Sequence, residues 1–215
     1  MILLKNLEKT FVDGPRFKTS NLTFQKGIYV IKGANGSGKT TLLKILGGID
    51  RNYKGNATYA KFNLPLFHSK TKAVKTYLND TPDYFGNVKA YDFLHTVCKI
   101  RKVQTQNRID YLHHHFNLEP STLENKFHAL SLGQKKKIFL SITLVETADV
   151  WVMDEPENGL DDLSRKALLE TLLKFKEDKT IIFSSHLLKK YEHNSMTFLN
   201  IEEFFKNENH DSSAS

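Results

Sequence analysis

The stretch "GANGSGKTT", residues 33–41, follows the apolar run "GIYVIK" and combines three glycines with a lysine and two threonines. Its spacing fits the pattern G-x-x-x-x-G-K-[ST], which is met by Gly33, Gly38, Lys39 and Thr40. Glycine has no Cβ and tolerates positive φ, so such a loop can wrap closely around phosphate oxygens and turn its N–H groups toward them. Apolar residues at helical spacing follow in "TTLLKILGG". The stretch therefore predicts a buried strand, a loop and a helix in that order.

The helix that follows the loop would add to this phosphate site. Its N-terminus would point at the same phosphates and contribute its dipole. We expect Lys39 to reach the β- and γ-phosphates of a nucleotide and Thr40 to place its hydroxyl on Mg²⁺. A glycine-rich turn with a lysine on its surface is the alternative, and the strand and helix on either side argue against it.

A second signal is acidic and lies in "ADVWVMDEPENGLDD", residues 148–162. Residues 150–153 form an apolar run that ends in Asp154 and Glu155. Parallel strands buried on both faces have this composition, and ligands bind beyond their carboxyl ends. We therefore expect Asp154 to hold Mg²⁺ and Glu155 to lie one residue nearer the phosphates. Taken alone, the pair could also be a solvated acidic turn.

A third signal is "ALSLGQKKKIFLSITLVETA", residues 129–148. Ser131 is a typical N-cap, and apolar residues at helical spacing follow it. Gly133 would expose backbone N–H groups in the first turn, which favours an anion there. By composition alone, however, this segment is a capped helix and no more.

Composition bounds the class of protein. The chain has 215 residues, of which 40% are hydrophobic and 26% charged, as is ordinary for a soluble globular domain. Its one cysteine, Cys98, excludes an intrachain disulfide. Because it has no run of 18 apolar residues, we expect no membrane span. The net charge of +7 fits nucleic acid, an anionic membrane surface, a polyphosphate ligand or simply a solvated basic surface.

The motifs together carry a family resemblance. "GANGSGKTT", "LSLGQKKK", "VWVMDEP", "NGLD" and "SSH" follow one another as they do in ATP-binding-cassette (ABC) ATPases, and the chain resembles that family over about residues 1–200. The "LS-x-GQ" signature separates this family from other P-loop NTPases. The resemblance implies one α/β domain over 1–215: a P-loop core with a small antiparallel β region (1–82 and 148–205), an inserted helical subdomain (83–147) and a flexible tail (206–215).

The resemblance also implies roles for single residues. ATP would be bound by the phosphate loop, with Phe11 stacking on adenine. Thr40 and Asp154 would hold Mg²⁺, Glu155 would be the general base, and His186 and Lys39 would act at the γ-phosphate. The ATP-binding residues implied in this way are Phe11, Gly33, Ala34, Asn35, Gly36, Ser37, Gly38, Lys39, Thr40, Thr41, Ser131, Gly133, Gln134 and Asp161.

One motif departs from the family pattern. Members usually carry a glutamine at the strand end before the helical subdomain, whereas this chain has no glutamine between Gln25 and Gln104. The segment "VKTYLND" places Asp80 there. With its shorter arm, Asp80 is expected to ligate Mg²⁺ or to position water.

The resemblance implies partners as well. Cassettes of this family pair head to tail, so the signature of one covers the ATP of another; the second cassette would be a copy or a sibling. A separate transmembrane subunit would dock around residues 80–100, which places the chain in the cytoplasm on the inner face of the cell membrane. The compact length is similar to bacterial exporters of peptides, lipids or drugs. A soluble ATPase of an assembly system, such as iron–sulfur cluster assembly, is the alternative, and no nucleic-acid partner is expected.

Overall fold

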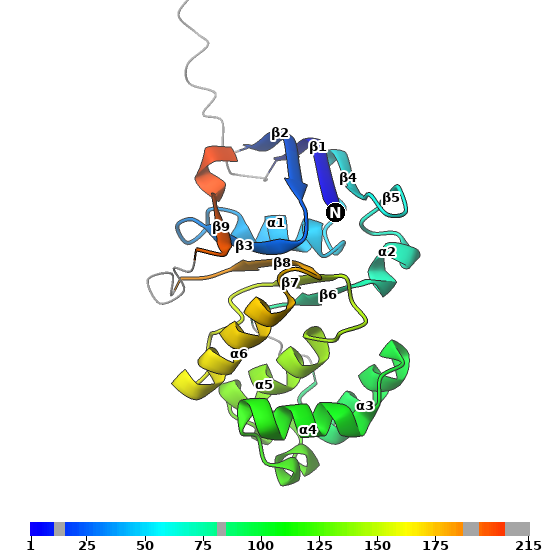
Figure 1. The fold of residues 1–215 in the computed structure, drawn as a ribbon, viewed down its shortest axis with the longest axis vertical. Coiled ribbons are helices and arrows are strands. Elements are labelled where there is room, and N and C mark those ends of the chain that lie inside the picture. Colours follow the sequence, from blue (N-terminus) through cyan, green and yellow to red (C-terminus); the bar gives the residue numbers. More distant parts are fainter. Residues whose placement is uncertain (11–15, 81–84, 187–193, 205–215) are drawn as a thin grey trace, which may run out of the picture.

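The computed structural model describes residues 1–10, 16–80, 85–186 and 194–204. These residues form stacked layers, with a parallel sheet between an antiparallel sheet and a group of helices (Figure 1). The α/β fold expected from the sequence is confirmed. The predicted boundary at residue 82 and the tail from residue 206 lie outside the described residues.

The strands that precede the sequence motifs belong to the parallel sheet. Its strands follow the order β6 (Lys75–Leu78), β7 (Val150–Met153), β8 (Thr180–Ser184), β3 (Gly27–Lys32) and β9 (Met196–Asn200). Every pairing within it is parallel, so all five carboxyl ends reach the same edge. All residues of β7 and β8 are buried, because both faces of these central strands are covered.

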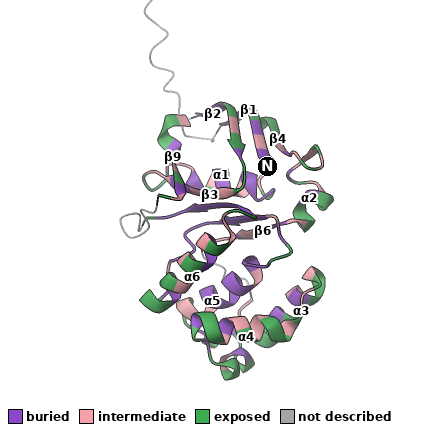
Figure 2. Cartoon of the chain, in the orientation of Figure 1, coloured by how far each residue is buried: buried purple, intermediate pink, exposed green. Residues whose placement is uncertain are grey.

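Side chains alternate between the two faces of this sheet. Trp151 and Met153 pack into the core on the side of the helices, whereas Val150 and Val152 pack into the core around α1. Figure 2 shows the strands mostly buried and the outer sides of the helices exposed. The strict alternation fixes the register, since a slip by one residue would exchange the two faces.

The antiparallel sheet packs over α1 (Lys39–Leu46). Its strands follow the order β2 (Arg16–Phe24), β1 (Ile2–Thr10), β4 (Lys54–Tyr59) and β5 (Leu64–Pro65). In β1 the buried positions change from Ile2 and Leu4 to Leu7, because Asn6 has φ 48° and the pairing with β4 shifts there. This bulge keeps the apolar side chains on the face toward α1.

Helices cover the opposite face of the parallel sheet. They are α3 (Ala90–Arg101), α4 (Thr105–Phe116), α5 (Leu132–Thr143) and α6 (Asp162–Phe175), with η1 (Pro120–Glu124) and η2 (Phe127–Ala129) between α4 and α5. Rings of Phe85, Phe93, Phe127 and Phe139 pack together with centroids 4.6–6.3 Å apart. This aromatic cluster ties α3 and α5 to one another and anchors the start of the helical layer.

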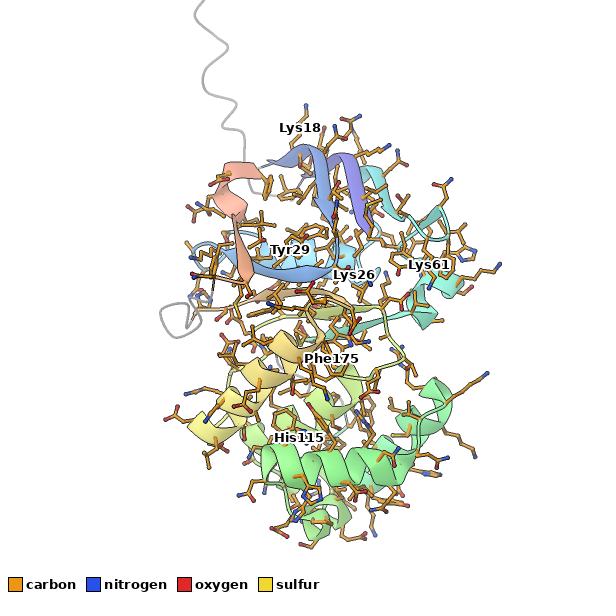
Figure 3. All side chains as sticks on the ribbon, viewed as in Figure 1. Lys18, Lys26, Tyr29, Lys61, His115 and Phe175 are labelled. Carbon is orange, nitrogen blue, oxygen red and sulfur yellow. The ribbon has the colours of Figure 1, made fainter. Side chains whose placement is uncertain are left out.

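Two short helices complete the described chain. They are α2 (Ser69–Ala73), before β6, and η4 (Ile201–Phe204), after β9. Within the described ranges, no helix is both long and apolar enough to cross a bilayer. The labelled Lys18 lies on β2, Lys26 just before β3 and Lys61 in the loop between β4 and β5, as expected for basic residues spread over the surface (Figure 3).

Candidate active site

The phosphate loop predicted from the sequence joins β3 to α1. Gly38 is the N-cap of α1 and has φ 91°, a left-handed conformation that favours glycine. The Lys39 ammonium folds back over the loop and donates to the carbonyls of Gly33 and Ala34, each at 2.9 Å. On the outer side, the Ala34 N–H donates to Glu202 Oε1 at 3.0 Å, which ties the loop to η4. The loop is therefore held in shape from both sides.

Asp154 joins this loop to the carboxyl ends of two strands. Its side chain is buried, with 2% of the residue exposed, at the end of β7. Thr40 Oγ1 donates to Asp154 Oδ2 at 2.7 Å, and Ser184 Oγ donates to Oδ1 at 2.7 Å. One carboxylate thus connects the start of α1, the end of β7 and the end of β8.

Glu155 is fixed beside it by β8 and the residues that follow. Its N–H donates to Ser184 Oγ at 2.9 Å, and its Oε2 accepts from the His186 N–H at 3.1 Å. The His186 ring reaches the other oxygen, with Nε2 3.1 Å from Oε1. Burial raises the pKa of Glu155, and the nearby His186 opposes this rise. A carboxyl group with a raised pKa and an oriented histidine is suited to accept a proton.

The Glu155 backbone is strained. Its φ is 44°, in the left-handed region that costs a residue with a side chain roughly 1–2 kcal/mol. Strain of this kind persists where surrounding contacts hold it, and it is concentrated at active sites. Here the contacts are the bonds to Ser184 and His186.

These groups surround one cavity of about 400 Å³. It joins the phosphate loop to the acidic residues at the strand ends and to His186. Its lining residues are Asn35, Gly36, Ser37, Gly38, Lys39, Thr40, Thr41, Asp80, Asp154, Glu155 and His186. Asp80 lies at this cavity with its Oδ1 accepting from Asn158 Nδ2 at 3.0 Å. The site is thus built where parallel strands end, as the sequence predicts.

The signature segment lies apart from this cavity. Ser131 caps α5: its Oγ accepts from the Gln134 N–H at 3.2 Å, and its own N–H donates to Gln134 Oε1 at 2.9 Å. This reciprocal capping box confirms the expected N-cap. A Cβ added to Gly133 would lie 2.5 Å from the carbonyl oxygen of Gly159, so only glycine fits this approach.

Asp161 is tied to the same helix. Its Oδ1 caps α6 through the Ser164 N–H at 2.8 Å, and its Oδ2 accepts from Lys137 Nζ at 2.8 Å. The bond to Lys137 is the main reason that the pKa of Asp161 lies well below its usual range. Neither Asp161 nor Ser131, Gly133 or Gln134 lines the cavity described above. Phe11, the expected adenine partner, lies outside the described residues.

Reasoning from the sequence missed some members of the site. Ser184 bonds both acidic residues, and the sequence carries a signal for it, because it directly follows the apolar residues 181–183 and lies two residues before His186. The buried Glu157 and Lys136, which do not line the cavity but bond residues beside it, carried no such signal, because charged residues of this kind are usually exposed.

With this geometry in hand, comparison with known proteins identifies the family. Residues 17–158 match the family model described as ABC transporter. The chain belongs to the ABC transporter family. It is an ATP-binding ATPase of the cassette type, as the resemblance of its motifs implies.

Relatives and solved structures agree with this assignment. The chain is 32% identical to the cytochrome c biogenesis ATP-binding export protein of Reclinomonas americana, over 86% of this chain and 84% of that protein. It is 28% identical to a lantibiotic transport ATP-binding protein of Streptococcus pyogenes, over 90% and 83%.

Solved cassettes share the fold. A putative ABC transporter ATP-binding protein from Pyrococcus furiosus superposes with a TM-score of 0.76 at 24% identity, over 95% of this chain and 99% of that one. A bacterial ABC transporter cassette solved as a dimer gives a TM-score of 0.78 at 20% identity, over 94% and 95%.

Removing the Ser184 hydroxyl tests the contacts that hold the two acidic residues. In Ser184→Ala, a buried oxygen of Asp154 and the buried N–H of Glu155 lose their partner, which should lower the free energy of unfolding by about 1–3 kcal/mol. Urea unfolding measures this change, and Ser121→Ala, at an exposed serine of η1, is the matched control. Equal stabilities of the two variants would contradict the contacts described.

Proposed function

We propose that this chain is the ATP-hydrolysing subunit of a bacterial ABC exporter, that it works in a head-to-tail pair of cassettes, and that it drives a separate membrane subunit. One observation carries the proposal. The cavity is lined by the phosphate loop, Asp154, Glu155 and His186, whereas the signature residues Ser131 and Gly133 lie outside it. A single chain therefore holds both halves of an ATP site but does not bring them together.

The exposed start of α5 supports pairing. Ser131 is exposed, and next to it Leu132 is 52% exposed; Leu163, at the start of α6, is 74% exposed. Apolar side chains left in water beside exposed polar groups favour contact with another protein surface. In the proposed pair, Ser131, Gln134 and the N–H of Gly133 cover the γ-phosphate held by the other cassette, and Asp161 contacts the opposite subunit.

Within each cassette, the phosphate loop binds the triphosphate. Residues 36–41 line the cavity that it would occupy, and the helix dipole of α1 favours its negative charge. Lys39 exchanges its bonds to two carbonyls for phosphate oxygens. Phe11 stacks on adenine, and Gly33 and Ala34 shape the start of the loop.

Hydrolysis depends on Glu155 and His186. Glu155 accepts a proton from the attacking water, a role that its raised pKa favours. His186 orients that carboxylate through both its backbone N–H and its ring, and contacts the γ-phosphate. In this reaction the protein contributes mainly by positioning and charge neutralisation.

The donor set at Asp154 fits Mg²⁺. A buried carboxylate beside the hydroxyl of Thr40 supplies hard oxygen ligands, and Mg²⁺ commonly takes one or two carboxylates together with substrate phosphates. Thr40 and Asp154 would hold the ion, with Asp80 at the rim of the cavity as a further candidate. Bound there, Mg²⁺ would neutralise charge on the phosphates.

Relatives favour export. Two of them are a cytochrome c biogenesis export protein and a lantibiotic transport protein, both described as ATP-binding. Apolar groups available to a membrane subunit lie near α3, where Val88 and Tyr91 are each 39% exposed and Ile100 is 73% exposed. The cassette would then lie at the inner face of the cell membrane, held there by its partner.

Changing Glu155 to glutamine tests the proposed pair. Glu155→Gln should lower kcat by about 100-fold or more, because the amide cannot accept the proton. It should also trap an ATP-bound pair in the presence of Mg²⁺, detected by size-exclusion chromatography with light scattering. Glu155→Gln combined with Lys39→Ala is the control, since weakened ATP binding should abolish the trapped pair. Normal turnover by Glu155→Gln would remove Glu155 from the role of base.

Membrane fractionation tests the proposed setting. Expressed in its own host, the chain should sediment with membranes and be released by alkaline carbonate, as expected for a protein held by a membrane subunit. A pull-down in mild detergent should then recover that subunit. A pool that never sediments with membranes would favour the soluble assembly ATPase instead.

A further inference from the structure

Glu157 is a buried carboxyl group that the proposed roles leave unused. It lies in the loop after β7 with only 1% of its surface exposed. Its Oε1 accepts a hydrogen bond from Ser185 Oγ, and its Oε2 has no hydrogen-bond partner among the described residues. Burial raises the pKa of Glu157 to about 7. Burying an acid is costly unless it is hydrogen-bonded, so the bond to Ser185 is the contact through which Glu157 can act on its neighbours.

The Ser185–Glu157 bond lies between two other bonds, those of Ser184 to Asp154 and of His186 to Glu155. Three successive residues from the end of β8 onward thus each form a hydrogen bond with an acidic residue at the end of β7 or just after it. Because Ser185 immediately precedes His186, fixing Ser185 also fixes the peptide N–H that His186 donates to Glu155.

The signature helix supplies a charge that suits this arrangement. Lys136, on α5, is 1% exposed, and its Nζ donates to the Asp80 carbonyl at 2.7 Å. Its positive charge lowers the pKa of Glu157 and so offsets part of the effect of burial. Asn158, the neighbour of Glu157, bonds the Asp80 carboxylate at 3.0 Å. Glu157 therefore lies between the end of β8 and the helix that begins after Ser131.

We propose that Glu157 is a positioning residue for ATP hydrolysis: by holding Ser185, it fixes His186 against Glu155. This inference rests on the proposed roles of Glu155 and His186. A carboxylate that only stabilises its own loop would affect folding and leave the catalytic step unchanged in the folded enzyme.

The test compares Glu157→Ala, Glu157→Gln and Ser185→Ala by steady-state ATP hydrolysis and by binding of a fluorescent ATP analogue. Glu157→Ala should lower kcat by at least about tenfold, because the misplaced His186 orients Glu155 poorly. Affinity for the nucleotide should stay unchanged, since Glu157 does not line the cavity. Glu157→Gln keeps an oxygen that can accept the hydrogen bond from Ser185, so it should retain most of the kcat that Glu157→Ala loses. Glu177→Ala, at an exposed glutamate, is the matched control.

A double-mutant cycle tests whether Glu157 acts on His186 through Ser185. If Glu157 acts through Ser185, Ser185→Ala should reproduce the loss in kcat, and adding Glu157→Ala should lower kcat no further. Should Glu157→Ala fail to fold, Ser185→Ala and Glu157→Gln still decide the matter, with thermal unfolding as the check on stability. Normal kcat in Ser185→Ala, additive losses in the double variant, or an effect confined to nucleotide affinity would overturn the inference.

Glu155→Gln in the same assay separates this inference from the proposed function. An inactive Glu155→Gln together with a fully active Glu157→Ala would reject only the role of Glu157. Normal turnover by Glu155→Gln would reject the proposed base, whatever Glu157 does.

Discussion

The site depends on one carboxylate, that of Asp154. It accepts hydroxyl hydrogen bonds from Thr40 and Ser184, each at 2.7 Å, and so joins the first turn of α1 to the ends of β7 and β8. Because the carboxylate is buried, it needs those donors; an unpaired charge in that position would destabilise the sheet edge. The hydrogen bond from Thr40 to this buried carboxylate also holds the start of α1, and with it the phosphate loop, next to Glu155.

Topology explains how a few residues that are distant in the sequence come together in the candidate site. Parallel pairing brings the ends of β3, β7 and β8 to one edge of the sheet, although residues 32, 153 and 184 are far apart in the sequence. Ser184, Ser185 and His186 then bond successive groups of the neighbouring loop. The signature residues Ser131 and Gln134 cap a helix in another layer and do not line the cavity, which is the observation behind the proposed pairing with a second cassette.

Much of this could be predicted from the sequence, for identifiable reasons. The order strand, glycine-rich loop, helix in residues 27–46 and the apolar run before Asp154 follow local rules, and the structure confirms both elements. The convergence of Thr40, Asp154, Glu155 and His186 on one cavity follows from the rule on strand ends. The burial of Lys136 and Glu157 could not be read in this way. Successive lysines at 135–137 point in different directions on a helix, and only the packing of α5 decides that Lys136 and Lys137 are buried.

The proposed mechanism requires ATP to be clamped between the phosphate loop of one cassette and the signature helix of another. The most direct measurement is a crystal structure of Glu155→Gln grown with ATP and Mg²⁺. We expect two chains related head to tail, with each triphosphate over residues 36–41 of one chain and within hydrogen-bond distance of Ser131 and the Gly133 N–H of the other. A triphosphate bound elsewhere, or one covered by no second chain, would contradict the account.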